Sequence, residues 1–104
     1  EIRTVAQLDR LVHEPARLML LMILQGVREA DFLYLLREGG FTQGNLSGHL
    51  LKLEEAGYVE IEKKFKGKRP LTLCRLTSKG EAALSAYSHN LIRALQSNRN
   101  AGED

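Results

Sequence analysis

The sequence predicts a mostly helical α+β fold, and three observations lead to this prediction. Two stretches with helical periodicity lie close together between residues 29 and 57. An alternating stretch, a basic turn and a second strand-like stretch follow directly, between residues 58 and 77. The chain has 104 residues, 43% of them hydrophobic, which suits one domain with one core. In this order, the parts predict a single winged helix-turn-helix domain over residues 1–104, with a two-stranded wing.

Two helices are expected ahead of residue 29. Thr4 and Gln7 have the spacing of a capping box, which predicts a short first helix within residues 1–14. Its apolar positions recur at helical spacing: Val5, Leu8, Leu11 and Val12. Pro15 suits the first turn of a second helix, because a missing N–H costs nothing there. Residues 18–24 are apolar on nearly all sides, which indicates a central helix that ends at Gly26.

The next two helices have the spacing of a helix-turn-helix, and together they occupy residues 29–57. The first is expected over residues 29–38, where Gly39 and Gly40 end it. Thr42 is a suitable N-cap for the second helix, and Gly57 closes it. The core stripe of the second helix falls at positions i, i+4 and i+7: Leu46, Leu50 and Leu53.

A β-hairpin and a last helix complete the predicted fold. Residues 58–65 alternate, and one face carries Val59, Ile61, Lys63 and Phe65. Residues 66–70 form a turn and residues 71–76 the return strand, so the wing extends over residues 58–77. Thr77 or Ser78 caps the last helix, which is expected over residues 78–97. Its apolar stripe consists of Leu84, Tyr87, Leu91 and Leu95.

Charge is distributed unevenly along the chain. The formal net charge is only +2, yet residues 63–79 contain seven basic residues and no acidic one. A local basic patch on a nearly neutral domain is typical of a protein that binds a polyanion. The alternative interpretation is a hairpin tip whose charges only face water.

Two sequence phrases resemble a known family. LSGHLLKLEEAGYV, over residues 46–59, resembles the recognition helix of the MarR/ArsR-like winged-helix transcriptional regulators and its exit into the wing. LTSKG, over residues 76–80, resembles the boundary after that wing. The similarity extends over about residues 10–95 and is to the small single-domain members. This resemblance implies a homodimer that binds operator DNA, with the terminal helices forming the dimer contact.

The expected recognition helix presents short polar side chains that suit base edges in a major groove. The candidates on this helix are Thr42, Gln43, Asn45, Ser47, His49 and Lys52. Gly44 and Gly48 weaken the helix by roughly 1 kcal/mol each relative to alanine, which favours a close approach by another surface. The alternative is a helix face that only contacts water. The helix contains no arginine, so we expect the wing to supply much of the DNA affinity. The wing candidates are Lys64, Lys66, Lys68 and Arg69.

The terminal stripes allow two interpretations. They can pack on the core of their own domain, or a second copy can cover part of them. Since one small domain has limited surface to cover both, we expect a homodimer built from residues 1–14 and 78–97. The expected interface residues are Val5, Leu8, Leu11, Val12, Leu84, Tyr87, Leu91 and Leu95.

Several other functions are not indicated. Cys74 is the only cysteine, which favours a reducing cytoplasm, and no signal peptide or membrane span is expected. The three histidines and Cys74 have no ligand spacing, so we expect neither a metal nor another cofactor. No catalytic motif occurs, so we expect no enzyme, and no feature supports a small-molecule effector. The alternative to a duplex-DNA-binding regulator is a winged-helix protein-interaction module in a larger assembly. Such a module does not need a strongly basic wing.

Overall fold

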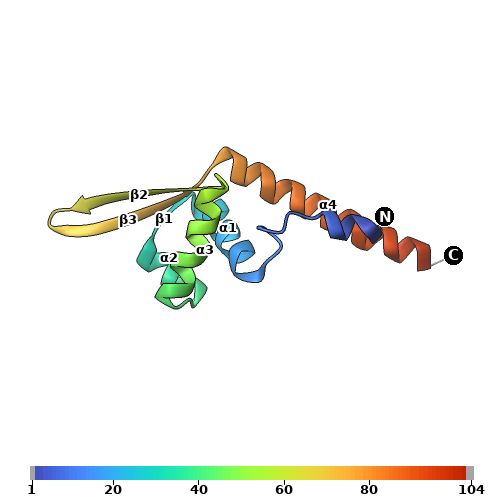
Figure 1. The fold of residues 1–104 in the computed structure, drawn as a ribbon, viewed down its shortest axis with the longest axis horizontal. Helices are drawn as coiled ribbons and strands as arrows, with labels where there is room; N and C mark the ends of the chain where they lie inside the picture. Colours follow the sequence, from blue (N-terminus) through green and yellow to red (C-terminus); the bar gives the residue numbers. More distant parts are fainter. Residues whose placement is uncertain (1, 103–104) are drawn as a thin grey trace.

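The computed structural model describes residues 2–102, and Figure 1 shows their arrangement. A three-stranded antiparallel sheet with the strand order β1-β3-β2 lies beside a group of short helices. The elements, in chain order, are the 3-10 helix η1 (Ile2–Gln7), α1 (Pro15–Val27), β1 (Glu29–Asp31), α2 (Phe32–Gly39), α3 (Gln43–Glu55), β2 (Val59–Lys66), β3 (Arg69–Leu76) and α4 (Ser78–Gly102). The prediction of a mostly helical α+β winged-helix fold is confirmed.

Side-chain caps determine where α2 and α3 begin. The carboxylate of Asp31 accepts the N–H of Tyr34 at 2.7 Å, and Thr42 Oγ1 accepts the N–H of Asn45 at 3.2 Å. Gly40 ends α2 with a φ of 66°, a left-handed conformation that glycine adopts without strain. The predicted start of the first of these helices at residue 29 is wrong, because residues 29–31 pair with β3 before Asp31 caps α2.

The wing is a long hairpin with a short turn. Lys66 pairs with Arg69, so only Gly67 and Lys68 form the turn, and Gly67 has a φ of 65°. The expected turn over residues 66–70 is therefore too long, and the return strand begins at Arg69. The wing also gains a third strand, because β1 pairs with the base of β3.

The N-terminal segment differs most from expectation. Residues 2–7 form a short 3-10 helix and turns follow, so the expected first helix is present but ends before Leu8, Leu11 and Val12. Asp9 Oδ1 accepts the N–H groups of Leu11 at 2.9 Å and Val12 at 3.4 Å, which competes with helical hydrogen bonds. The second helix begins at Pro15 as predicted, but it continues through Gly26 to Val27, and Arg28 caps it with a φ of 71°.

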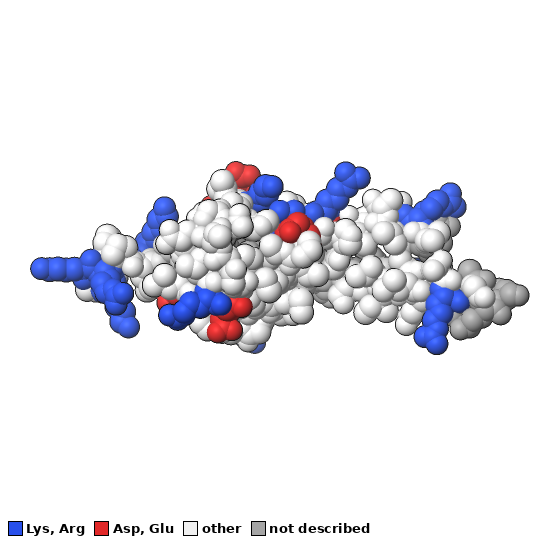
Figure 2. All heavy atoms as spheres, turned by 90° about the horizontal axis from the view of Figure 1, so that it is seen from below, with Lys and Arg blue, Asp and Glu red and all other residues white. Residues whose placement is uncertain are grey.

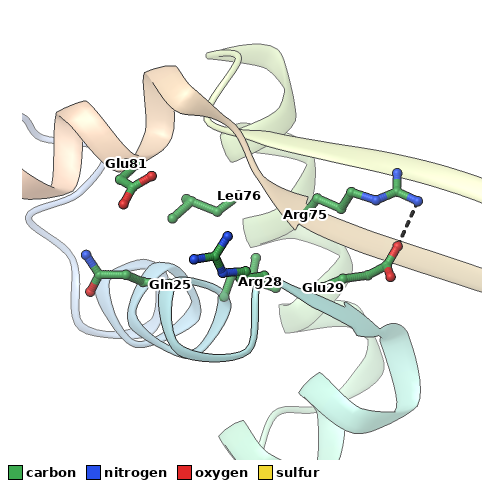
Figure 3. Close-up of a pocket in the computed structure, with 7 residues that line it drawn as sticks. Gln25, Arg28, Glu29, Arg75, Leu76 and Glu81 are labelled. Carbon is green, nitrogen blue, oxygen red and sulfur yellow. Dashed lines mark ion pairs between the residues drawn. The ribbon is translucent and has the colours of Figure 1, made fainter.

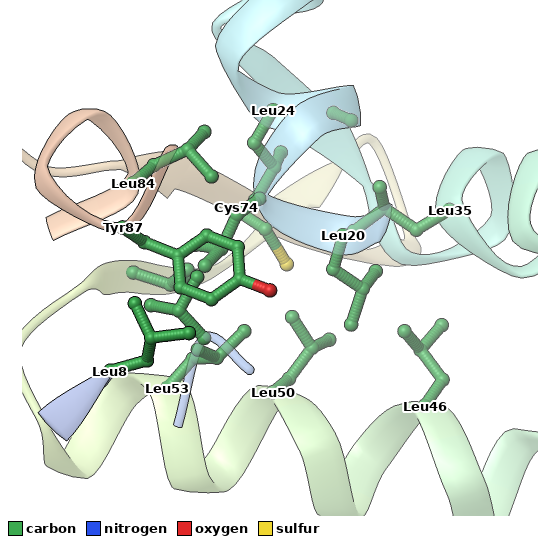
Figure 4. Close-up of a cluster of buried hydrophobic side chains, with 14 residues drawn as sticks. Leu8, Leu20, Leu24, Leu35, Leu46, Leu50, Leu53, Cys74, Leu84 and Tyr87 are labelled. Atoms are coloured by element: carbon green, nitrogen blue, oxygen red, sulfur yellow. The ribbon is translucent and has the colours of Figure 1, made fainter. Parts of the chain in front are cut away.

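One apolar core joins all of these parts (Figure 4). The stripe predicted for α3 is buried, and Leu46 and Leu53 are fully covered. Cys74 of β3 is also fully buried, and burial, together with the nearby carboxylates of Asp31 and Glu54, raises the pKa of its thiol to about 11. The thiol therefore packs as a small apolar group. The sheet, α1 and α2 contact α3 and thus hold it in one orientation.

The overall shape is elongated. The principal extents are 65 × 25 × 21 Å, and the radius of gyration is 16.2 Å. A compact domain of this length has a radius of gyration of about 13 Å. The wing extends from one end of the body and α4 from the other, and η1 lies along α4 (Figure 1). No helix within residues 2–102 has the length and apolar character needed to cross a membrane.

Candidate nucleic-acid interface

Helix α3 presents one face to the core and the opposite face to solvent. Its leucines pack inward, whereas the polar side chains of Gln43, Asn45, Ser47 and Lys52 are exposed. These four are among the residues that the sequence predicts for DNA contact. A helix that is fixed by its buried stripe presents its free face with little conformational freedom, which suits the reading of a groove.

The two glycines of α3 lie on the exposed face. At about 100° per residue, Gly44 and Gly48 lie nearly opposite Leu46. A Cβ added at either glycine meets no atom within 4 Å, so the packing of this chain does not require glycine there. The pair leaves a low, flat patch on the helix, which suits close contact with another surface.

His49 and Thr42 are positioned differently from the other candidates. His49 is half-buried, and its Nδ1 lies 3.3 Å from Arg17 Nη1 and 3.7 Å from Glu14 Oε2. Its ring also lies beside that of Phe41. The structure thus directs Nδ1 of His49 toward the start of α1, away from the free face of α3. The hydroxyl of Thr42 is occupied as the N-cap acceptor.

Sequence reasoning missed the junction that holds α3 on α1. Arg17 is only 9% exposed, and its Nε donates to the carbonyl of Leu11 at 2.7 Å. Glu14 caps α1 by accepting the N–H groups of Ala16 at 3.1 Å and Arg17 at 2.8 Å. Burial disfavours the charge of Glu14, but these N–H groups and nearby positive charge hold its pKa below the usual value. The pair Glu14-Pro15 is the sequence signal that indicates such a cap.

The wing tip carries cations without acidic partners. Among residues 2–102, no acidic side chain forms an ion pair with Lys66, Lys68 or Arg69. Figure 2 shows Lys and Arg side chains gathered at the far end of the wing. Uncompensated charge on a projecting hairpin favours contact with a polyanion.

Closer to the base of the wing, two cations lie beside acidic side chains. Arg75 Nη2 lies 2.7 Å from both Glu62 Oε1 and Glu29 Oε1, and Arg75 Nη1 lies 3.5 Å from Glu60 Oε1. The hydrogen bond from Arg75 lowers the pKa of Glu62. Lys64, a predicted wing contact, lies 3.9 Å from Glu62. The stretch that contains no acid in sequence therefore has acidic neighbours in space at Lys64 and Arg75, whereas the three tip cations form no ion pair among residues 2–102.

Surface hollows lie near these elements, including one of 340 Å³ between α2 and the wing, where Asp31, Lys66 and Arg69 are among the lining residues. A groove of 740 Å³ separates α3 from the wing, and its lining consists of Phe32, Ser47, Leu50, Leu51, Glu54, Ile61, Lys63 and Thr72. A smaller hollow of 330 Å³ lies between α1, β1, β3 and α4, where Arg28, Glu29, Arg75 and Glu81 contribute polar groups (Figure 3). Within the described residues, no three His, Cys, Asp or Glu side chains come together as a metal site.

The eight predicted interface residues divide into two groups. Leu8, Val12, Leu84 and Tyr87 are buried within a single chain, so they need no partner to cover them. Leu11 and Leu91 are half-buried. Val5 is 42% exposed and Leu95 is 62% exposed. The apolar surface left uncovered on α4 and η1 consists of these two residues together with Ile2 and Ile92.

An exposed polar helix beside a basic hairpin, both held by one core, defines a DNA-binding protein of the winged helix-turn-helix class. Comparison with known proteins agrees. The family model of the winged helix DNA-binding domain matches residues 16–95, and the chain belongs to this family. As the sequence phrases predict, it is a winged-helix DNA-binding regulator, and this class is not enzymatic.

Three relatives illustrate the similarity. An uncharacterised protein of Methanocaldococcus jannaschii is 33% identical over 84 residues, which cover 81% of this chain and 91% of that protein. The transcriptional regulator homologue from Pyrococcus horikoshii OT3 superimposes with a TM-score of 0.80 at 26% identity, over 86% of this chain and 88% of that one. The transcriptional repressor BigR from Xylella fastidiosa has a TM-score of 0.60 at 27% identity, over 88% and 87% of the two chains.

Proposed function

We propose that the protein is a homodimer that binds a near-palindromic operator in duplex DNA in the cytoplasm. Helix α3 enters the major groove, and the wing contacts the adjacent backbone and minor groove. The observation that carries this proposal is the combination of a flat, polar, solvent-facing α3 with unpaired cations at the wing tip. The helix supplies base contacts, which read the sequence, and the wing tip supplies phosphate contacts, which position the protein on the duplex.

Base contacts are assigned to the N-terminal half of α3. Gln43 and Asn45 have amide groups that pair with adenine, and Ser47 accepts or donates at either base or phosphate. Glu54 and Glu55 at the end of α3 repel phosphates, so these two side chains point away from the backbone. Thr42 and Lys52 contact phosphates at the two margins of the helix. Lys66, Lys68 and Arg69 do so from the wing.

The exposed apolar surface of α4 supports the dimer. Leu95 and Ile92 are 62% and 51% exposed on a helix of 25 residues, about 37 Å long, that extends beyond the core. Ile2 and Val5 of η1 lie beside this helix and are also exposed. A second copy that packs against this strip buries all four side chains. A two-fold dimer then sets two α3 helices about 34 Å apart, in successive major grooves.

The test is selection of binding sequences from a random duplex library by the full chain. The proposal expects enrichment of an inverted repeat whose half-sites are about one helical turn apart. Enrichment of a single half-site would remove the dimer from the proposal. If no sequence is enriched and the protein does not retain duplex DNA at low salt, the chain is a protein-interaction module instead.

A further inference from the structure

Phe65 is the most exposed large apolar side chain within residues 2–102, with 72% of its surface accessible. It lies in β2 directly opposite Pro70 of β3, one pair before the turn. Two apolar residues therefore face solvent together near the end of the wing. Burial in the core explains most large apolar residues of this chain, but it does not explain this pair.

Phe65 lies on the face of the wing that faces α3. Side chains alternate along a strand, so Ile61, Lys63 and Phe65 share one face. Ile61 and Lys63 line the groove beside α3, together with Ser47 and other residues of that helix. Phe65 continues this face beyond the groove, toward the tip. A duplex that lies against α3 therefore meets the Phe65 side of the wing.

The length of the wing beyond the α3 groove is comparable to the spacing of DNA grooves. Phe65 is four residues beyond Ile61, which corresponds to about 13 Å along the strand. Neighbouring major and minor grooves are about half a helical turn apart, roughly 17 Å. When α3 occupies a major groove, the part of the wing beyond Ile61 therefore extends toward the minor groove next to it.

The charges around Phe65 indicate which partner it contacts. Lys66 and Arg69 form the next pair toward the turn, where side chains alternate to the other face of the hairpin, and Lys68 lies in the turn. No acid within residues 2–102 pairs with these three cations. A minor groove has phosphates along both rims and an apolar floor of sugar and base edges. An apolar pair on one face of the hairpin tip, with cations on its other face and in its turn, complements that arrangement.

We propose that Phe65, supported by Pro70, acts as an apolar wedge in the minor groove and selects against guanine there. The exocyclic amino group of guanine projects into the minor groove, where it obstructs an inserted ring. A·T pairs lack this group, and so do inosine·cytosine pairs, which otherwise resemble G·C in the major groove. This inference rests on the proposed function, because it requires that α3 and the wing bind duplex DNA.

The test compares binding to short duplexes of equal length made of A·T, I·C or G·C pairs. Fluorescence anisotropy measures the affinity of each duplex across a range of salt concentrations. The unmodified protein should bind the A·T and I·C duplexes more tightly than the G·C duplex. Phe65→Ala should bind the first two roughly tenfold more weakly, should lose the preference, and should keep the same salt slope.

Lys68→Ala is the matched control. It removes a charge two residues past Lys66 on the same turn, so it should lower the salt slope by about 0.9 and retain the preference for I·C over G·C. Phe65 is too exposed for its loss to unfold the domain, which a thermal melt checks. If Phe65→Ala keeps the preference, or lowers the salt slope as Lys68→Ala does, the wedge is overturned. Failure of the unmodified protein to bind any duplex would instead remove the proposed function.

Discussion

Arg75 and Glu62 face each other on the outer side of the wing, with 2.7 Å between Nη2 and Oε1. Glu29 and Glu60 approach the same guanidinium, so protein acids already neutralise its charge. Arg75 is thereby distinguished from the cations at the wing tip, although both belong to one basic stretch of the sequence.

This pairing predicts different salt dependences for two variants. Lys66→Gln should lower the slope of log affinity against log salt by about 0.9, because a phosphate contact is lost. Arg75→Gln should leave the slope unchanged, since its charge interacts with carboxylates of the protein. Anisotropy titrations on one duplex measure both slopes. A reduced slope for Arg75→Gln would mean that Arg75 contacts DNA despite its three acidic neighbours.

Replacing Gly48 should change stability and binding in opposite directions. Gly48→Ala adds a methyl group into open space, so it should stabilise the fold by about 0.5–1 kcal/mol through helix propensity. The same methyl group lies on the face assigned to the major groove and should weaken DNA binding. Gly26→Ala is the control, because Gly26 is exposed within α1 and a Cβ there also meets no atom. Equal DNA affinity for both variants would count against α3 as the groove-facing surface.

Gln43 and Asn45 should determine specificity more than affinity. Gln43→Ala or Asn45→Ala should reduce the discrimination between a selected operator and unrelated DNA by about 1–3 kcal/mol per base contact. Binding to unrelated DNA should hardly change. Competition titrations against both duplexes give the ratio. A parallel loss on both would show that these amides contact only the backbone.

The hydrogen bond from Tyr58 to Asp9 should stabilise the fold in a pH-dependent way. It holds the phenol proton, and together with burial it raises the pKa of Tyr58 to about 12, above the ordinary value of 10.0. Its contribution is therefore complete below about pH 10 and is lost as the pH rises through about 12. Tyr58→Phe should cost about 1–2 kcal/mol in urea unfolding at pH 7, and the difference should shrink at strongly alkaline pH. A difference independent of pH would exclude this role for the phenol proton.

A charge on the exposed strip of α4 should separate the dimer. Leu95→Glu places a carboxylate on this surface and should give a folded monomer with operator binding about 100-fold weaker, because two linked half-sites no longer act together. Met22→Glu is the control, since Met22 of α1 is 57% exposed and lies outside the strip. Sedimentation velocity distinguishes the two forms. A monomeric unmodified protein at tens of micromolar would contradict the dimer.

The helix-turn-helix and the wing can be predicted from sequence because their signals are local. Thr42, Gly40 and the leucine stripe of α3 each act on neighbouring residues, and each has its expected effect. The short strand β1 has no comparable signal, because Glu29, Ala30 and Asp31 form a strand only through their pairing with β3.

The sites that were missed depend on contacts between distant residues. Arg75 is far in sequence from Glu29, and their pairing depends on the register of the sheet. His49 meets Glu14 only because α3 packs against the start of α1. Residues that look alike in the sequence therefore differ in ion pairing and in solvent exposure once the sheet is assembled.

Hydroxyl-radical footprinting of the unmodified protein on its selected duplex tests the central claim most directly. If a two-fold dimer binds with α3 in the major groove, two protected blocks should lie about one helical turn apart. Each block should have a flanking minor-groove segment that the wing protects. The flanking segments should reappear as cleaved when Lys66, Lys68 and Arg69 are replaced by alanine. Uniform cleavage at protein concentrations that saturate an anisotropy titration would contradict groove binding by α3 and the wing.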